Sequence, residues 1–205
     1  MKKGLLLIGI TAIAVAVYFI FFTGGAEPLT KAPKQQPLVQ GKNSDVFNKP
    51  FNEMLDSYFA LKNALVEWDS VTAAKQGTTL AGLTAQVPYE TLKADTTIIA
   101  TAKSFSESVS AEALGISGET TLEGMRRSFY TLSENLYNLL RTVQYDQQII
   151  YHDKCPMAFN DQEEGYWLSN TKEIINPYLG KKHPRYASGM IGCGSVEDSL
   201  DYRSK

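Results

Sequence analysis

Apolar residues in the middle of the chain recur at spacings of three and four, the pattern of helices that bury one face. The series is most regular over residues 122–143, where steps of three and four alternate without interruption, and a second regular run covers residues 51–68. Asp69 or Ser70 is expected to cap a further helix, and Pro88 fits the first turn of another. Four amphipathic segments with short connections predict an all-α fold, an antiparallel up-down four-helix bundle.

Each helix must bury its apolar stripe, so we expect these stripes in the core rather than in a groove for a partner. The inward residues predicted for the four helices are, in chain order, Phe51, Met54, Leu55, Tyr58, Leu61, Leu65 and Trp68; Val71, Ala74, Leu80, Leu83 and Val87; Leu92, Ile99, Ala102, Phe105 and Val109; and Leu122, Met125, Phe129, Leu132, Leu136, Leu139 and Val143. Arg126, Arg127, Glu134 and Arg141 are predicted to form a solvated face of the last helix. The helices show no paired inward carboxylates and no Glu-x-x-His motif, so a di-iron bundle is unsupported.

A long apolar run at residues 4–22 follows Lys2 and Lys3. At a helical rise of about 1.5 Å per residue it spans roughly 28 Å, close to the thickness of a hydrocarbon core. Residues 1–26 are therefore predicted to be a signal anchor, an N-terminal transmembrane helix that makes a single pass through a bacterial inner membrane with its lysines in the cytoplasm. The alternative is a signal peptide that is cleaved after Ala26. Either reading delivers the rest of the chain to the periplasm, which favours disulfides.

Residues 27–50 have a different composition, in which proline, lysine, glutamine and asparagine outnumber apolar residues. Such a segment cannot bury a core, so we expect a flexible linker. The folded domain is predicted over residues 51–196, with a tail at 197–205. A chain of 205 residues that is 43% hydrophobic and carries a net charge of -2 suits one such domain, and it offers no basic face for nucleic acid.

Residues 151–194 hold both cysteines, both histidines and two of the five methionines. Helical periodicity has ended by then, and we expect a small C-terminal hairpin and loop motif. Pro156 favours an extended conformation at Cys155, and alternate residues of an extended chain share a face, so Cys155 and Met157 should point the same way. His152 should point away from Cys155 unless the chain bends between them.

Three glycines within residues 189–194 allow a tight loop in which Met190 and Cys193 converge. Two thiolates and two thioethers form a soft donor set, which favours Cu(I), with Ag(I) as a chemical mimic. The predicted metal ligands are Cys155, Met157, Met190 and Cys193, with His152 in reserve. Zinc would prefer the cysteines together with His152 and His183, but their spacing matches no zinc-finger pattern.

A disulfide is an open alternative, because two cysteines in an oxidising compartment often pair. A Cys155–Cys193 bridge would close a long loop and add about 4 kcal/mol in the chain-entropy model. Both methionines would then fill gaps under Trp167. The two states can also alternate, since a reduced pair binds metal and an oxidised pair releases it. A Cys155–His152 nucleophile lacks an orienting acid, and no Cys-x-x-Cys motif is present, so we predict that the protein is not an enzyme.

The first helix and the terminal motif resemble the bacterial domain of unknown function 3347 family. The residues that carry the resemblance are 58–65, Cys155-Pro156-Met157-Ala158, 167–169, 172–174, Asn176-Pro177-Tyr178 with Gly180, Met190, and Cys193-Gly194. It extends over about residues 51–196, and residues 181–186 are an insertion that adds His183. Members occur alone behind a signal segment or fused to adaptors of copper and silver efflux pumps. The resemblance therefore implies a helical bundle and a role near copper handling.

Together these features predict an extracytoplasmic, membrane-tethered domain that binds Cu(I) or Ag(I). It would buffer the metal or pass it to a heavy-metal efflux adaptor or a metallochaperone. The alternative is a structural or protein-interaction module that is stapled by a Cys155–Cys193 disulfide and binds no metal.

Overall fold

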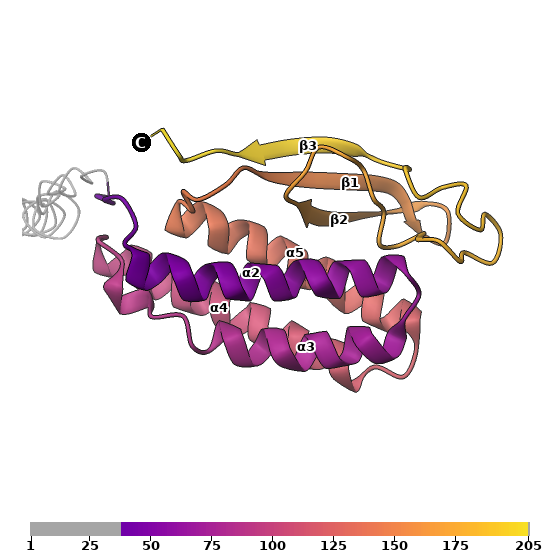
Figure 1. The fold of residues 1–205 in the computed structure, drawn as a ribbon, viewed down its shortest axis with the longest axis horizontal. Helices are drawn as coiled ribbons and strands as arrows, with labels where there is room; N and C mark the ends of the chain where they lie inside the picture. The colour runs from indigo at the N-terminus through magenta and orange to yellow at the C-terminus, as the bar shows by residue number, and fades with distance from the viewer. Residues whose placement is uncertain (1–37, 205) are drawn as a thin grey trace, which may run out of the picture. The chain divides into compact units, whose positions relative to one another are not determined.

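The computed structural model describes residues 38–204. In that part of the chain, helices come first and a three-stranded antiparallel sheet follows (Figure 1). The elements are α2 (Asp45–Val66), α3 (Ser70–Thr84), the short 3-10 helix η1 (Tyr89–Thr91), α4 (Thr96–Gly118), α5 (Leu122–Val143), β1 (Ile150–Phe159), β2 (Glu163–Ser169) and β3 (Ser195–Leu200). The strand order is β2-β1-β3, so β1 is the central strand.

The sheet shows that the all-α prediction is wrong. The expected hairpin is present as β1 and β2, but β3 joins the other side of β1 and makes the motif a sheet. The strands were hard to recognise because they do not alternate between apolar and polar residues. The first half of β1 is buried on both faces, and β3 is exposed at all positions except Leu200. An alternating pattern requires one buried and one solvated face.

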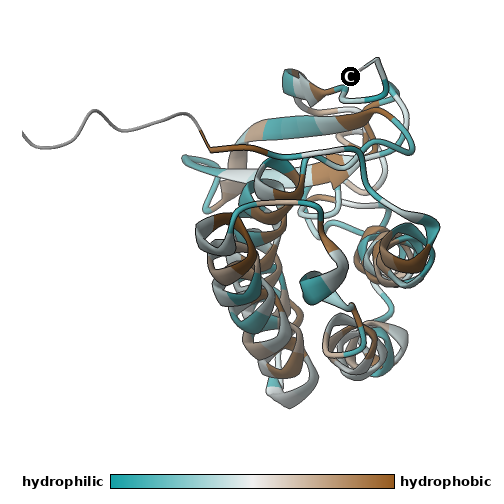
Figure 2. Cartoon of the chain, turned by 90° about the vertical axis from the view of Figure 1, so that its left-hand side faces the viewer, coloured by the Kyte–Doolittle hydropathy of each residue, from teal (hydrophilic) through white to brown (hydrophobic). Residues whose placement is uncertain are grey.

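The four-helix part of the prediction is confirmed for the described residues. Helices that follow one another in the chain pack side by side, and α5 also packs on β2. The strands lie on one side of the helices in both ribbon views (Figure 1) (Figure 2). The sheet therefore adds a second layer to the bundle.

The predicted membrane helix within residues 1–26 lies outside the described residues, as does most of the predicted linker. No helix in the described range, residues 38–204, is long and apolar enough to cross a membrane. Helix α2 begins at Asp45, inside the range 27–50 that was expected to be linker. Strand β3 likewise continues into the expected tail at 197–205.

Two helix starts are set by side chains that cap them. Asp69 accepts a hydrogen bond from the Thr72 N–H at 2.9 Å, which confirms it as the cap of α3. The Thr121 hydroxyl accepts from the Gly124 N–H at 3.1 Å and begins α5. Pro88 does not open a helix as predicted, because it precedes the 3-10 turn and α4 begins only at Thr96.

Tyr58 of α2 connects the helices to the sheet. Its ring stacks on Phe129 of α5, with ring centroids 5.3 Å apart. Its hydroxyl lies 2.8 Å from the Ser133 hydroxyl and accepts a hydrogen bond from the Leu168 N–H of β2 at 2.9 Å. The predicted apolar stripes of α2 and α5 are buried around this contact, whereas Val71 of α3, predicted inward, is 80% exposed.

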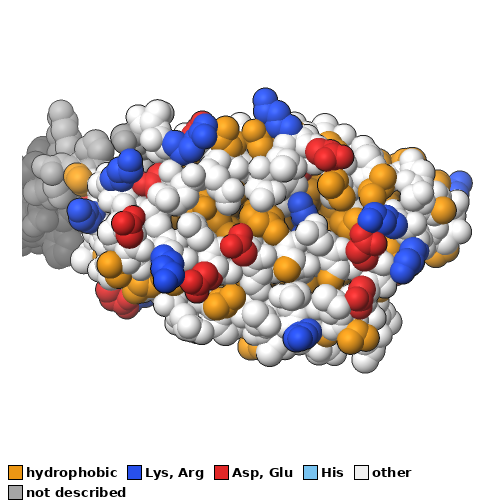
Figure 3. Space-filling model, viewed as in Figure 1, with side chains coloured by type: hydrophobic (Ala, Val, Ile, Leu, Met, Phe, Trp, Pro, Cys, Tyr) orange, Lys and Arg blue, Asp and Glu red, His pale blue; other side chains and the backbone are white. Residues whose placement is uncertain are grey.

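The surface carries both signs of charge in close mixture. In the view of Figure 3, lysine and arginine side chains are interspersed with aspartate and glutamate rather than gathered in one patch. This distribution agrees with the small net charge of -2 and offers no basic stripe on that face.

Candidate functional site

The two cysteines come together although they are far apart in the sequence. Cys155 lies on β1 and is fully buried, and Cys193 lies in the turn before β3 and is half-buried. Their Sγ atoms are 3.6 Å apart, and both thiols are free. The convergence that the sequence predicts is therefore present. Two sulfurs that share a tetrahedral metal at about 2.3 Å each would lie about 3.8 Å apart, so this spacing fits a common metal ion.

Cys193 is held in place by the polar side chain of Asn176. The Asn176 amide donates to the Cys193 carbonyl at 2.7 Å, and its backbone N–H donates to the Ile191 carbonyl at 2.8 Å. The next residue, Gly194, has φ +141°, and a Cβ there would lie 2.6 Å from the Lys154 carbonyl oxygen. Glycine is therefore required where this turn enters β3.

The segment that carries Asn176 is itself tied to the helices. The Trp68 indole N–H donates to the Leu179 carbonyl at 3.0 Å, and the Arg126 Nε–H donates to the Pro177 carbonyl at 2.9 Å. Gly180 has φ +55°, and a Cβ would meet the Val66 carbonyl at 2.6 Å. The position of Cys193 thus depends on contacts between the 176–180 segment and the ends of α2 and α5.

The two predicted methionine ligands both lie between the two cysteines in the chain, each close to one of them. Met190 belongs to the same turn as Cys193, since the Cys193 N–H donates to the Met190 carbonyl at 3.0 Å, and Met190 is half-buried against the core. Met157 is two residues beyond Cys155 on β1 and lines a cavity of about 500 Å³. The described residues contain no group of three or more His, Cys, Asp and Glu side chains that could hold a metal. In the predicted ligand set, the donors besides the two thiols and His152 are the Met157 and Met190 thioethers.

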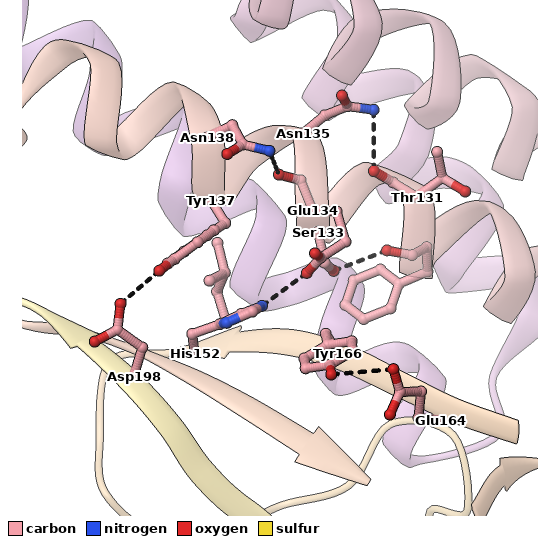
Figure 4. A network of polar contacts seen from close by, with 12 residues as sticks. Thr131, Ser133, Glu134, Asn135, Tyr137, Asn138, His152, Glu164, Tyr166 and Asp198 are labelled. Atoms are coloured by element: carbon pink, nitrogen blue, oxygen red, sulfur yellow. Dashed lines mark hydrogen bonds and ion pairs between the residues drawn. The ribbon is translucent and has the colours of Figure 1, made fainter. Parts of the chain in front are cut away.

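His152 is engaged elsewhere. Its Nε2 lies 2.7 Å from the Glu134 carboxylate of α5, and its ring stacks between those of Tyr137 (4.1 Å) and Tyr166 (5.0 Å). Figure 4 shows the imidazole directed toward α5, beside the hydrogen bond from Tyr137 to Asp198. Strand β1 pairs with β2 without interruption from Tyr151 to Cys155, although a bulge toward β3 lies between His152 and Asp153. His152 contacts Glu134 of α5 while Cys155 contacts Cys193, so the two side chains lie on opposite faces, as strand geometry predicts.

His183 is a structural residue of the loop at 181–186. Its Nδ1 accepts hydrogen bonds from the backbone N–H groups of Arg185 (3.2 Å) and Tyr186 (3.4 Å). A neutral imidazole that accepts at Nδ1 carries its proton on Nε2, so the ring presents an N–H and not a lone pair. The nitrogen donors that zinc would need are therefore already committed.

The Cys193 thiol is protonated at neutral pH. Burial, together with the hydrogen bond and charge of Cys155, raises the pKa of Cys193 to about 11. Metal ligation requires thiolates, so binding must displace protons and should weaken in acid. The two free thiols can therefore bind a soft metal as thiolates, or be oxidised to a disulfide.

This raised pKa predicts slow alkylation of Cys193. At pH 8 its reaction with iodoacetamide should be roughly 100-fold slower than that of an ordinary thiol, because the thiolate is the nucleophile. The pH–rate profile should have its midpoint near pH 11. In Cys155→Ala the midpoint should fall, since the Cys155 contribution is gone. A wild-type midpoint between pH 8 and 9 would contradict the assignment.

Three buried charged residues near the site were not predicted from the sequence. Arg126 was expected on a solvated face, but it is only 6% exposed. Lys62 of α2 and Asp153 of β1 are also buried, and the Lys62 Nζ donates to the Ser169 hydroxyl at 3.3 Å. Lys62 falls between apolar positions of an otherwise regular helical stripe, and this position was the sequence signal that could have indicated a buried lysine. Buried charges are rare unless they are paired or functional.

Comparison with known proteins identifies a family over the helices. Residues 54–148 match the family described as Protein of unknown function (DUF3347), which confirms the resemblance that the sequence predicts. The match begins within α2 and ends just before β1. It therefore leaves Cys155 and Cys193 outside, although the resemblance was expected to extend to about residue 196. No curated protein and no solved structure matches the chain.

Proposed function

Since the helical region of this chain belongs to the DUF3347 family, we propose that it is the scaffold for a soft-metal site at Cys155 and Cys193. The site binds Cu(I), or Ag(I) as its mimic, through two thiolates. The protein buffers the metal or passes it on.

The observation that carries this proposal is the 3.6 Å separation of two free thiols. Cys155 is fully buried in the central strand, whereas Cys193 is half-buried in the turn that precedes β3. Such a pair offers one preorganised and one accessible sulfur. A metal can then exchange with a partner through Cys193 without opening the core.

The surrounding donors favour copper over zinc. His152 is hydrogen-bonded to Glu134, and His183 accepts backbone hydrogen bonds at Nδ1. Thioethers remain, from Met190 in the same turn and Met157 on the same strand. Sulfur-rich sets of this kind prefer Cu(I), while structural zinc takes cysteine and histidine.

The setting of the site is part of the same proposal. An N-terminal signal anchor would place the domain on the periplasmic side of the inner membrane, where the metal partner would be an efflux adaptor or a metallochaperone. The membrane placement rests on the apolar run at residues 4–22 and on the lysines that precede it, whereas the kind of partner is what the family resemblance implies.

The short distance between the Cys155 and Cys193 sulfurs also suits a second function. If the compartment oxidises the pair, a Cys155–Cys193 disulfide would staple the turn before β3 to β1, and the module would serve as a structural or interaction domain without metal. The bridge would stabilise the fold by about 4 kcal/mol in the chain-entropy model. The two functions differ in the oxidation state of the protein as isolated.

Titration of the reduced full-length protein with Cu(I) against a competing chelator tests the metal site. We expect one Cu(I) per chain. Cys155→Ser or Cys193→Ser should weaken binding by at least about 100-fold, because a single thiolate cannot chelate. Met190→Leu should have a smaller effect, and Met125→Leu in the helical core is the matched control.

Two outcomes would contradict the proposal. The first is that the reduced wild type takes up no Cu(I) against the chelator, and the second is that the cysteine variants bind as tightly as the wild type. The disulfide function predicts a different result, namely that protein isolated without reductant has no free thiols while Cys193→Ser has one.

A further inference from the structure

A cavity of about 500 Å³ opens between the helices and the hairpin, at the end of the molecule near the thiols. The C-terminal end of α2, the first turns of α5, the end of β1 and the inserted loop surround it. The lining residues that matter here are Trp68, Arg126, Met157, Phe159, Tyr178 and His183. Its volume is in the range of sites for small organic ligands.

Arg126 is the unusual residue of this cavity. It is 6% exposed, and its guanidinium lies 4.2 Å from the centre of the Trp68 ring. Its Nε–H donates to the Pro177 carbonyl at 2.9 Å, and Nη2 donates to the Leu65 carbonyl at 3.1 Å. Both acceptors are neutral, and a guanidinium has five N–H groups. Burial lowers the pKa of Arg126 to about 10, so it remains charged at neutral pH.

The carboxylates around the cavity are committed to other cations. Glu123 pairs with Arg127 at 3.2 Å, and Asp161 pairs with Arg185 at 2.6 Å. Among the ion pairs of the described residues, none includes Arg126. A buried charge without a counter-charge is costly, and a bound anion would compensate it.

We propose that this cavity binds a small organic carboxylate, whose charged end is held by Arg126 and whose apolar body lies against Trp68 and Phe159. Arginine presents a planar fork that matches a carboxylate. His183, which carries its proton on Nε2, adds a second N–H donor to the lining. The apolar and aromatic wall favours an organic anion over a bare inorganic one.

The carboxylate site is independent of the proposed metal function. It shares only Met157 with the proposed ligand set, and Arg126 contacts neither cysteine. Metal-free protein should therefore bind the carboxylate, so failure of one proposal leaves the other standing.

Phenylacetate and phenylacetamide form a matched probe pair that differs in charge and not in shape. The full-length, metal-free protein is titrated with each, and the Trp68 indole N–H resonance is followed by NMR. We expect saturable shifts with phenylacetate at a dissociation constant at least about tenfold lower than for the amide, the ratio expected from a charge-assisted hydrogen bond. Equal affinity for the two probes, or no shift with either, would overturn the proposal.

Two variants make the test specific. Arg126→Met should remove the preference for the carboxylate, while Arg141→Met, at an exposed arginine of the same helix, should retain it. Because Arg126 also bridges two backbone segments, its variant can lose stability. Leu122→Trp keeps Arg126 and fills the cavity instead, so it should abolish binding of both probes. Unchanged binding in Leu122→Trp, or an unchanged preference in folded Arg126→Met, would refute the site.

Discussion

Replacing Lys62 with methionine should lower the free energy of unfolding by about 3 kcal/mol at pH 8, because it leaves the Asp153 carboxylate buried without its cation. Lys62 and Asp153 are both buried, and the Lys62 Nζ donates to the Ser169 hydroxyl at 3.3 Å. Neither Asp153 oxygen has a hydrogen-bond partner among the described residues, so the Lys62 charge is the compensation that the carboxylate has. Burial raises the pKa of Asp153, while the positive charge of Lys62 opposes that rise. Without Lys62 the pKa should rise further.

The sign of the pH dependence follows from that shift. A carboxyl whose pKa is higher in the folded than in the unfolded chain binds its proton preferentially when folded, so acid favours folding. The loss in Lys62→Met should therefore be smaller at pH 5 than at pH 8. Urea denaturation at both values measures it.

Lys103→Met is the matched control, because Lys103 forms a surface ion pair with Glu90. Its effect should stay within about 0.5 kcal/mol at either pH. If Lys62→Met were as stable as the wild type at pH 8, the folded chain would not depend on the pair.

Replacing Gly180 with alanine should lower the free energy of unfolding by about 2–5 kcal/mol, as backbone strain and a steric clash add together. The residue has φ +55°, and the new Cβ would lie 2.6 Å from the Val66 carbonyl oxygen and 2.7 Å from the Trp68 indole nitrogen. The backbone cannot move aside easily, and neither can the Trp68 ring, which is hydrogen-bonded to Leu179 and covered by the Arg126 guanidinium. The 176–180 segment should therefore shift, and Asn176 would no longer place Cys193.

Gly180→Ala should consequently affect the thiol site as well as stability. Cu(I) affinity and the spontaneous rate of Cys155–Cys193 bridge formation should both fall relative to the wild type. Gly82→Ala provides the control, since a Cβ there meets nothing within 4 Å and alanine favours a helix by about 1 kcal/mol. A Gly180→Ala protein of wild-type stability would show that the segment is not held as described.

The helical half of the fold was predictable because its signal is local. The residues that α2 and α5 bury, such as Phe51, Leu65, Phe129 and Leu136, repeat along single helices, and their period is independent of distant partners. Prediction failed for β3, where five of six positions are exposed, and for Arg126, which follows Met125 on what reads as a polar face. Whether those positions are buried or exposed depends on which distant segments of the chain pack against them.

For the candidate site, the sequence by itself determined the types of metal-binding side chain and which of them share a face of β1. Cys155 and Met157 stand at alternate positions of a strand, and His152 at the opposite parity, so the local backbone already separates the histidine from the thiols. Only the tertiary structure decided that Cys193 meets Cys155, that both histidines are committed, and that Arg126, Lys62 and Asp153 are buried. Those facts depend on contacts between residues far apart in the sequence, 17 positions for Asn176 with Cys193 and 111 positions for Trp68 with Leu179. Local periodicity records how a segment folds on itself, but not which distant segment covers it.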